Sequence, residues 1–279
     1  MRLANIGGRA HLLFGAAATD IHQASDGRFP ADPRAVFDHW DALRDWAGEA
    51  ERHAEEFDES DLLIPTPDTR QVFAIGANYK DHAREAGIPL PDAPMIFTKF
   101  PASLTGPHDT ITLPTDGVDY EVELVVVMGR RAVGVAEGEA WNYVAGLAVG
   151  QDLSERAIQR SGPMPQFSMG KSFTGFGPIG PAIVTVDELP DPHSLEIGCR
   201  IDDEVLQKST TAELVFDVPD LIARISAVLP LLPGDLIFTG TPAGVGLSHE
   251  PPRFLKPGEV LTSWIEGIGT ISNPLVARP

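Results

Sequence analysis

The sequence predicts a mixed β protein with flanking helices and a small N-terminal α+β module. Three observations favour this class. The 27 glycines and 25 prolines among 279 residues break the chain into short apolar runs, as expected for many strands joined by turns. Few segments show the spacing of apolar residues that marks a long helix. The contents of hydrophobic (43%) and charged (22%) residues are those of a globular domain, which argues against disorder and coiled coil.

The N-terminal module is assigned to residues 1–68. A Gly-Gly pair lies between two short apolar runs and predicts a hairpin over residues 2–14. A helix is predicted from Asp32, its N-cap, to Ala54, because a proline follows the cap and apolar residues then recur with helical spacing. The proline-rich segment 65–67 ends the module, since a residue before proline favours extended geometry.

Residues 69–279 are predicted to form the main domain. Its expected strands are Val72–Ile75, Thr110–Leu113, Tyr120–Met128, Tyr143–Gly150, Pro181–Val186, Leu195–Ile201, Asp235–Thr239 and Val260–Ile265. Its expected helices are Tyr79–Ala86, Leu153–Arg160 and Val218–Leu229, the last with Asp217 as its N-cap. The string Gly175–Gly180 fits a dinucleotide loop, but Pro181 forbids the helix that must follow it, so no nucleotide is expected.

The charge of the chain limits its partners. Lys and Arg number 21 against 40 Asp and Glu, a formal net charge of −19. Such a surface repels phosphate backbones and anionic lipid, so neither nucleic acid nor membrane is an expected partner. The single cysteine cannot form an internal disulfide, and no signal peptide or membrane helix is apparent. We expect a cytoplasmic protein, in which an anionic substrate would need a local metal ion or cations.

Two glutamates form the most informative motif. Glu121 and Glu123 stand two residues apart at the start of an apolar strand, so their side chains should lie on one face. Taken alone, such a pair is more often a solvated edge. The continuous apolar run Leu124–Met128 instead indicates a strand covered on both faces, where paired carboxylates need a cation. Hard oxygen ligands favour Mg²⁺, Mn²⁺ or Ca²⁺.

A third metal ligand is predicted at Asp152, at the end of the next apolar strand. By its local pattern alone, Asp152 would be the N-cap of the helix that starts at Leu153. Arg156 and Gln159 lie four and seven positions after Asp152, on the same face of that helix, and could hold a carboxylate substrate. The alternative is an ordinary Asp–Arg pair on a solvated helix.

Three further groups could take part in chemistry. His82 and Glu85 are three positions apart on a short predicted helix, so the carboxylate could orient the imidazole as a general base, although two exposed polar residues would give the same pattern. Lys171 lies on a loop rich in glycine and proline and is either a substrate cation or a surface lysine. The glycine-rich loop 239–246 could bring backbone N–H groups to a ligand, although most such loops are plain turns.

In their order along the chain, these motifs resemble those of the fumarylacetoacetate hydrolase family. The resemblance extends from about Gln71 to Asn273. The matching strings are Asn78-Tyr79 with His82 and Glu85, Phe97-Thr98-Lys99, Asp119 to Leu124, Asp152 with Arg156 and Gln159, Gly170-Lys171-Ser172, Pro178 to Pro181, Pro233-Gly234-Asp235 and Thr239 to Gly246. No single string would suffice, but the ordered set is specific.

The resemblance implies a β-roll or β-sandwich core with flanking helices, a homodimer, and Mg²⁺ or Mn²⁺ as the cofactor, with Ca²⁺ as an alternative occupant in a crystal. It implies that the metal ligands are Glu121, Glu123 and Asp152, that the catalytic residues are His82, Glu85 and Lys171, and that the substrate-binding residues are Tyr79, Arg156, Gln159 and Thr241. A 2-oxo acid would chelate the metal, which stabilises an enolate, while the His–Glu dyad activates water.

The leading function implied is hydrolysis of a C–C bond in a 2,4-dioxo acid of the acylpyruvate or fumarylpyruvate type, as in aromatic catabolism. An oxaloacetate-type decarboxylase or a dienedioate isomerase could use the same site. The alternative of another class is a noncatalytic protein that binds a 2-oxo acid. Two departures from the family pattern, Gln151 in place of the common Asn and Thr174 in place of Asp, leave the identity of the substrate open.

Overall fold

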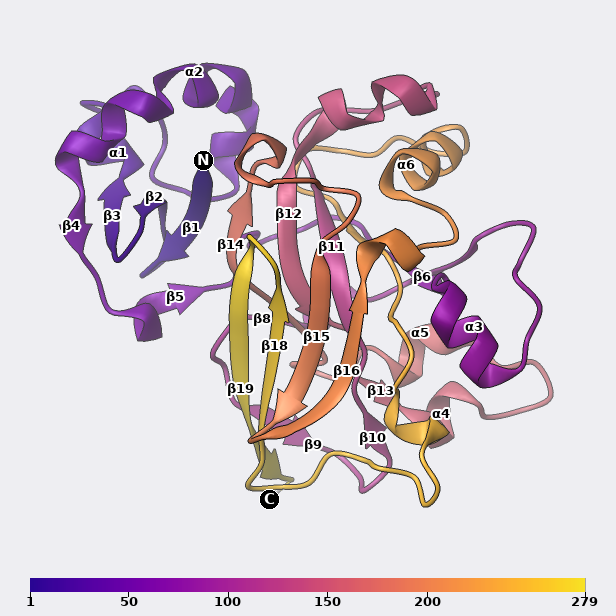
Figure 1. The fold of residues 1–279 in the computed structure, drawn as a ribbon. Coiled ribbons are helices and arrows are strands. Elements are labelled where there is room, and N and C mark those ends of the chain that lie inside the picture. Colours follow the sequence, from indigo (N-terminus) through magenta and orange to yellow (C-terminus); the bar gives the residue numbers. More distant parts are fainter. Residues whose placement is uncertain (279) are drawn as a thin grey trace.

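The computed structural model describes residues 1–278 as two main β-sheets with short helices around them (Figure 1). The strands are β1 Arg2–Ile6, β2 Arg9–Phe14, β3 Ala17–Asp20, β4 Glu55–Glu56, β5 Leu62–Leu63, β6 Val72–Gly76, β7 Met95–Thr98, β8 Leu104–Thr105, β9 Ile111–Leu113, β10 Val118–Asp119, β11 Val122–Met128, β12 Val144–Gln151, β13 Ser154–Glu155, β14 Gly177–Val184, β15 Glu196–Ile201, β16 Glu204–Thr210, β17 Leu236–Phe238, β18 Val260–Ile265 and β19 Gly269–Ala277. The α-helices are α1 Ile21–Ala24, α2 Trp40–Ala50, α3 Lys80–Ala86, α4 Arg156–Gln159, α5 Phe167–Gly170 and α6 Val218–Ser226.

The larger sheet runs through both the N-terminal module and the main domain. Its strand order is β4-β3-β2-β1-β14-β12-β11-β17-β6-β7. β1 pairs antiparallel with β14, with Leu3 opposite Ile183, so the strands of residues 1–68 continue the sheet of the main domain. The division at residue 68 stays a prediction.

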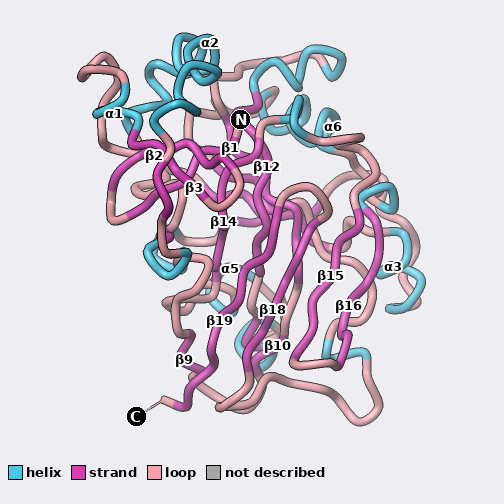
Figure 2. Tube along the Cα trace, turned by 60° about the vertical axis from the view of Figure 1, so that its left-hand side comes forward, coloured by secondary structure: helices cyan, strands magenta, loops and turns pink. Residues whose placement is uncertain are grey.

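The second sheet has the order β16-β15-β18-β19-β9 and packs against one face of β11 and β12. Figure 2 shows its four long strands, β15, β16, β18 and β19, side by side. The main apolar core lies between the two sheets and includes Val122, Leu124 and Val126 of β11 and Ile197 and Cys199 of β15. This arrangement confirms the predicted mixed β class with flanking helices.

The opposite face of β11 is covered as well. Val125 and Val127 point away from the second sheet into another apolar core, which includes Trp40 of α2. Because side chains alternate along a strand, Glu123 falls on the same side as these two valines. Every residue of β11 is buried, as the apolar run Leu124–Met128 predicts.

Most predicted elements are present. The predicted hairpin consists of β1 and β2, and each strand predicted for the main domain overlaps a strand of the structure. The long helix predicted from Asp32 to Ala54 is wrong in extent, because its first part is a 3-10 helix, Ala35–His39, that leads into α2. The strands β3, β7, β16 and β19 were not expected, since their apolar runs are short or interrupted by polar residues.

The helix predicted from Leu153 to Arg160 is also wrong in extent. Its first residues form β13, in which Ser154 pairs with Asp119 of β10, and only the single turn α4 follows. The cap of α4 is Glu155, whose side chain accepts from the N–H of Ile158, so the reading of Asp152 as an N-cap is wrong. Helical spacing in the sequence cannot report a pairing with a distant strand.

The N-cap predicted for α6 is confirmed, and its removal should be measurable. The Asp217 side chain accepts from the N–H of Asp220 at 3.0 Å, at the start of a helix that buries Leu221 and Ile225. We expect Asp217→Ala to lower the free energy of unfolding by about 1 kcal/mol, whereas Asp217→Asn, which keeps a capping oxygen, should stay close to wild type. Chemical denaturation of both variants measures this, and equal stability of Asp217→Ala and wild type would contradict it.

Candidate active site

Three carboxylates meet where β11 begins and β12 ends. The two strands are antiparallel, with Val122 opposite Gln151, so Glu121 and Glu123 on one strand lie beside Asp152 just after the other. One oxygen atom of each carboxylate lies within 4.8 Å of the other two. All three side chains are buried. The structure therefore contains an acidic cluster that could hold a metal ion, and the solvated-edge interpretation of the glutamate pair is wrong.

Two buried lysines contact this cluster. Lys171 Nζ donates to Glu121 Oε2 at 2.6 Å, to Asp152 Oδ2 at 2.7 Å and to Ser154 Oγ at 2.8 Å. Lys99 Nζ donates to Asp152 Oδ1 at 2.7 Å and to two backbone carbonyls. Lys171 is therefore an internal cation, and its interpretation as a surface lysine is wrong.

Arg156 contacts the cluster from another direction. Its Nε and Nη2 lie 2.8 and 2.6 Å from Asp119 Oδ2, and its Nη1 lies 2.7 Å from Glu121 Oε1 and 2.8 Å from Gln159 Oε1. A guanidinium has five N–H bonds, and these contacts occupy four of them among the described residues. Arg156 thus orients Glu121, and one of its N–H bonds has no partner in the described part of the chain.

The pKa values of Glu121 and Glu123 are shifted in opposite directions. Burial alone would raise the pKa of Glu121, but Lys171 and Arg156 outweigh it and lower the pKa to about 2. Burial also acts on Glu123, where Asp152 and Glu121 add to it, and the pKa rises well above its usual range. Within residues 1–278, Glu123 has no ion-pair partner.

The two lysines also differ. Burial lowers the pKa of Lys171, but the charges of Asp152 and Glu121 outweigh it and raise the pKa above its ordinary value. For Lys99, burial outweighs the attraction of Asp152 and the pKa is lowered. Lys171 therefore holds its proton firmly between two carboxylates, which suits a fixed positive charge rather than a base.

Glu123 is oriented by the glycine-rich loop that follows β17. Its Oε2 accepts from the N–H of Gly240 at 2.8 Å. Gly240 has φ +99°, and a Cβ atom there would lie 2.8 Å from Asn78 Cβ. Only glycine fits both the left-handed backbone and this close approach.

The predicted dyad forms a contact. His82 Nδ1 lies 3.2 Å from Glu85 Oε2 on α3, and both side chains are partly buried. The other oxygen of Glu85 accepts from the N–H of Gly244 at 2.9 Å. The dyad helix is thus docked on loop 239–246, the loop that also orients Glu123.

Two predicted substrate-binding residues have different surroundings. Tyr79 is fully buried, and its hydroxyl has no hydrogen-bond partner in the described part of the chain. Burial and the negative charges of Glu123 and Asp81 raise the pKa of Tyr79 well above its ordinary value. A buried donor without a partner near carboxylates is suited to a ligand. The hydroxyl of Thr241 instead donates to the carbonyl of Val122 at 3.0 Å.

The prediction that Asp152, Arg156 and Gln159 share one helical face is wrong, because Asp152 lies outside α4. Arg156 and Gln159 do contact each other, but the aspartate that Arg156 binds is Asp119. Arg156 and Gln159 are both buried, so the alternative of a solvated Asp–Arg pair is wrong too. Their contact with a substrate stays a prediction.

Lys99 and Asp119 have no individual role among the residues predicted from the sequence, although both stand in strings of the family pattern. Lys99 directly follows the apolar strand β7, which is the one hint that its side chain turns inward. Asp119 precedes the glutamate pair but looks like another exposed acidic residue. Both are fully buried, and each fixes a charged group of the site.

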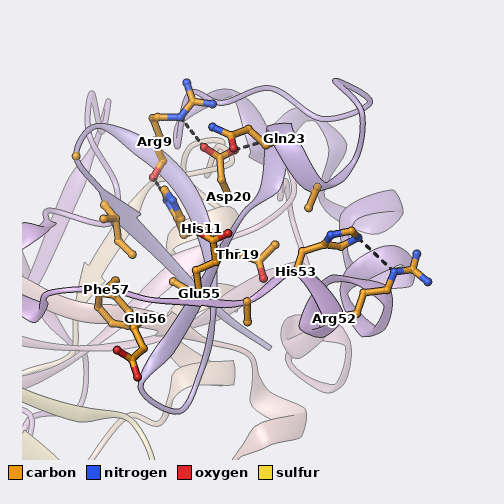
Figure 3. Close-up of a pocket in the computed structure, with 15 residues that line it drawn as sticks. Arg9, His11, Thr19, Asp20, Gln23, Arg52, His53, Glu55, Glu56 and Phe57 are labelled. Carbon is orange, nitrogen blue, oxygen red and sulfur yellow. Dashed lines mark hydrogen bonds and ion pairs between the residues drawn. The ribbon is translucent and has the colours of Figure 1, made fainter.

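A cavity of about 700 Å³ lies in the N-terminal module and contains none of the predicted site residues. Figure 3 shows side chains of mixed charge around it, among them Arg9, Asp20, Arg52 and His53. Arg9 binds Asp20 at 2.6 Å and Arg52 donates to His53, so these cations already have partners. The acidic cluster, rather than this cavity, is therefore the candidate active site.

Comparisons with known proteins agree on one family. The model of the C-terminal domain of fumarylacetoacetate (FAA) hydrolase matches residues 71–276. The mitochondrial oxaloacetate tautomerase FAHD2A of Bos taurus is 44% identical over 217 residues, which cover 77% of this chain and 69% of that protein. No helix of residues 1–278 has both the length and the apolar character to cross a membrane.

Solved structures match over the whole chain. A crystal structure of a protein from Mycobacterium smegmatis is 50% identical with a TM-score of 0.92, and each chain covers 100% of the other. The structure of maleylpyruvate hydrolase from Sphingobium sp. SYK-6, in complex with manganese(II) ion and pyruvate, is 28% identical with a TM-score of 0.83, again with 100% of both chains covered.

Proposed function

Because the chain belongs to the fumarylacetoacetate hydrolase family, we propose that it is a metal-dependent enzyme that forms the enolate of a 2-oxo acid. The observation that carries this proposal is the buried cluster of Glu121, Glu123 and Asp152, two of which are held by lysines. Buried carboxylates at this spacing are costly unless cations neutralise them.

The residues of the cluster fit a divalent cation. They offer hard carboxylate oxygens, which Mg²⁺ and Mn²⁺ prefer, and one of the three carboxylates has no ion-pair partner among the described residues. Glu121, Glu123 and Asp152 would hold the ion. When bound, it supplies Lewis-acid stabilisation of the negative charge that develops on the substrate oxygen.

The charge balance supports an anionic substrate. With every group ionised, the four carboxylates of the cluster and its ion pairs exceed the three buried cations by one negative charge, and a divalent ion changes this to one positive charge. The carboxylates are Asp119, Glu121, Glu123 and Asp152, and the cations are Lys99, Lys171 and Arg156. A local positive site explains how a chain of net charge −19 could bind an acid.

The dyad of His82 and Glu85 would transfer a proton to or from the substrate. Glu85 contacts Nδ1 of His82, so Nε2 is the nitrogen left for transfer, and Glu85 would stabilise the imidazolium that forms. Lys171 is less suited to this role, because its Nζ already donates to Glu121, Asp152 and Ser154. His82 is thus the base that we assign.

The reaction that we propose first is keto–enol tautomerisation of oxaloacetate. The relative from Bos taurus named for this activity is 44% identical to the chain over 217 residues, which cover 77% of the chain. From keto to enol, His82 would take a proton from the carbon next to the ketone, and the ketone oxygen would gain a proton. From enol to keto, the enol oxygen would lose its proton and protonated His82 would deliver one to that carbon; no water attacks in either direction.

The second candidate is the hydrolysis of a 2,4-dioxo acid, which the family resemblance favoured. The maleylpyruvate hydrolase that shares the fold supports it, although the identity is lower at 28%. Here His82 would activate water for attack on the distal carbonyl, and the bond to the carbon between the two carbonyls would break. Decarboxylation of oxaloacetate and isomerisation of a dienedioate stay as predicted alternatives.

One panel of substrates separates these reactions. The purified full chain should be assayed with Mg²⁺ or Mn²⁺ against enol-oxaloacetate, maleylpyruvate, fumarylpyruvate, acetylpyruvate and a dienedioate, with loss of the enol absorbance and release of pyruvate as readouts. We expect metal-dependent loss of enol-oxaloacetate without loss of CO₂ to be the fastest reaction. Faster release of pyruvate from a dioxo acid would favour the second candidate, and tight oxalate binding without any turnover would contradict both.

A further inference from the structure

The backbone between the two glutamates of the cluster has an unusual set of partners. β11 pairs with β17 only from Val125 to Val127, and the carbonyl of Leu124 still accepts from the N–H of Thr239 at 3.0 Å. Two residues earlier, Val122 presents its N–H and carbonyl to the same side, where β17 no longer continues. Val122 separates Glu121 from Glu123, so whatever holds it also fixes both carboxylates.

Beside Val122, where β17 has ended, three hydrogen bonds form a closed ring in place of strand pairing. The N–H of Val122 donates to Gln207 Oε1 at 2.9 Å, Gln207 Nε2 donates to Thr241 Oγ1 at 2.8 Å, and Thr241 Oγ1 donates to the carbonyl of Val122 at 3.0 Å. The direction of each bond is fixed, because a backbone N–H can only donate and a carbonyl can only accept. The orientation of the Gln207 amide follows from these partners.

Gln207 belongs to β16, in the second sheet, and is 1% exposed. Its second N–H bond goes to the carbonyl of Pro242 at 2.9 Å, and its oxygen also lies 3.3 Å from Cys199 Sγ. All donors of the amide, and both acceptor positions, therefore have partners. A buried amide satisfied in this way holds its neighbours in one geometry.

The same side chain reaches the loop that orients Glu123. Thr241 and Pro242 follow Gly240, whose N–H donates to Glu123 Oε2. The loop also packs closely on β16, since a Cβ atom on Gly244 would lie 2.4 Å from the carbonyl of Leu206. The side chain of Gln207, in the second sheet, thus connects β11 to the glycine-rich loop 239–246.

We propose that Gln207 is a positioning residue of the metal site, a role that rests on the proposed function. Through Val122 it fixes the spacing of Glu121 and Glu123, and through Thr241 it fixes the loop that holds Glu123. Residues that orient metal ligands without touching the metal typically change metal affinity about 10- to 100-fold when they are replaced.

Metal affinity of the full-length protein tests this role without any activity assay. Mn²⁺ binding should be titrated by electron paramagnetic resonance of the free ion. We expect Gln207→Met, which keeps the length but removes the amide, to weaken binding about 10- to 100-fold. Thr241→Val should weaken it similarly because it opens the same ring, and Thr241→Ser, which keeps the hydroxyl, should restore nearly wild-type affinity.

A buried amide elsewhere in the second sheet provides the control. Asn273 of β19 is fully buried and donates to the carbonyls of Gly106 and Asp109, with no contact to the acidic cluster. Asn273→Leu should lose stability but keep its Mn²⁺ affinity. The double variant Gln207→Met with Thr241→Val should lose less affinity than the product of the two single losses, because both open one ring.

The outcomes separate this role from the function on which it rests. If wild type binds Mn²⁺ and Gln207→Met binds equally well, Gln207 has no positioning role. If Gln207→Met does not fold, equal affinities of Thr241→Val and Thr241→Ser would overturn the role in the same way. If wild type itself binds no Mn²⁺, the proposed metal-dependent function fails, and this role fails with it.

Discussion

Replacing Glu123 with glutamine should weaken Mn²⁺ binding by more than about 100-fold, which exceeds the typical cost of losing a residue that only orients a ligand. The metal-free protein should nevertheless stay at least as stable as wild type near neutral pH. Burial, Asp152 and Glu121 raise the pKa of Glu123 well above its usual range, so its ionised form destabilises the fold. A neutral amide removes this repulsion and can still accept from Gly240.

Glu121→Gln is the matched control, because the same change should have the opposite effect on stability. Lys171 and Arg156 outweigh burial and lower the pKa of Glu121 to about 2. Its charge therefore stabilises the fold at neutral pH, and this contribution is lost as the pH falls towards 2. Thermal unfolding with a chelator measures both variants, and Mn²⁺ titration gives their affinities. Wild-type affinity in Glu123→Gln would rule out Glu123 as a ligand.

The second large effect concerns the dyad. His82→Ala should slow oxaloacetate tautomerisation, and any dioxo-acid hydrolysis, by about 10²- to 10⁴-fold, the usual range for a general base. Decarboxylation of oxaloacetate needs chelation and enolate stabilisation but no base at this position, so it should fall much less. Mn²⁺ affinity should remain, because His82 contacts none of the three carboxylates. Rates at saturating metal measure the difference.

Two variants of α3 show whether the loss comes from the base or from the helix. Arg84 is exposed on the same helix, so Arg84→Ala should leave both reactions near wild type. Glu85→Gln removes the charge behind His82 and alters the bond to Gly244, and it should slow proton transfer less than His82→Ala does. Equal losses of tautomerisation and decarboxylation in His82→Ala would mean that the dyad closes the site and does not transfer a proton.

The part of the site that follows from local pattern could be predicted. Alternation along β11 places Glu121 and Glu123 on one face, and the apolar run after them indicates burial on both faces. The dyad depends on a spacing of three within one short helix, and the contact forms as expected. These are properties of a few neighbouring residues, which sequence order reports directly.

The rest depends on distant partners, and no local pattern reports those. Ser154 extends into a strand because β10 lies beside it, so helical spacing misleads there. Lys99 is buried because Asp152, 53 positions away, accepts from it. Gln207 stands in a largely polar strand, and its amide meets the N–H of Val122 only because β17 does not extend that far. A sequence shows which groups can form such bonds but not which ones meet.

The pairing of β1 with β14 has a consequence for how the chain folds. Arg2 lies opposite Val184, so during synthesis β1 waits for a partner strand that is made about 180 residues later. β6 likewise waits for β17, which pairs with it at Val72 and Leu236. Such high contact order slows folding, because long loops must close before the contacts form. During synthesis the edge of β1 that β14 will cover stays open, and an unpaired strand edge of this kind favours aggregation until its partner arrives.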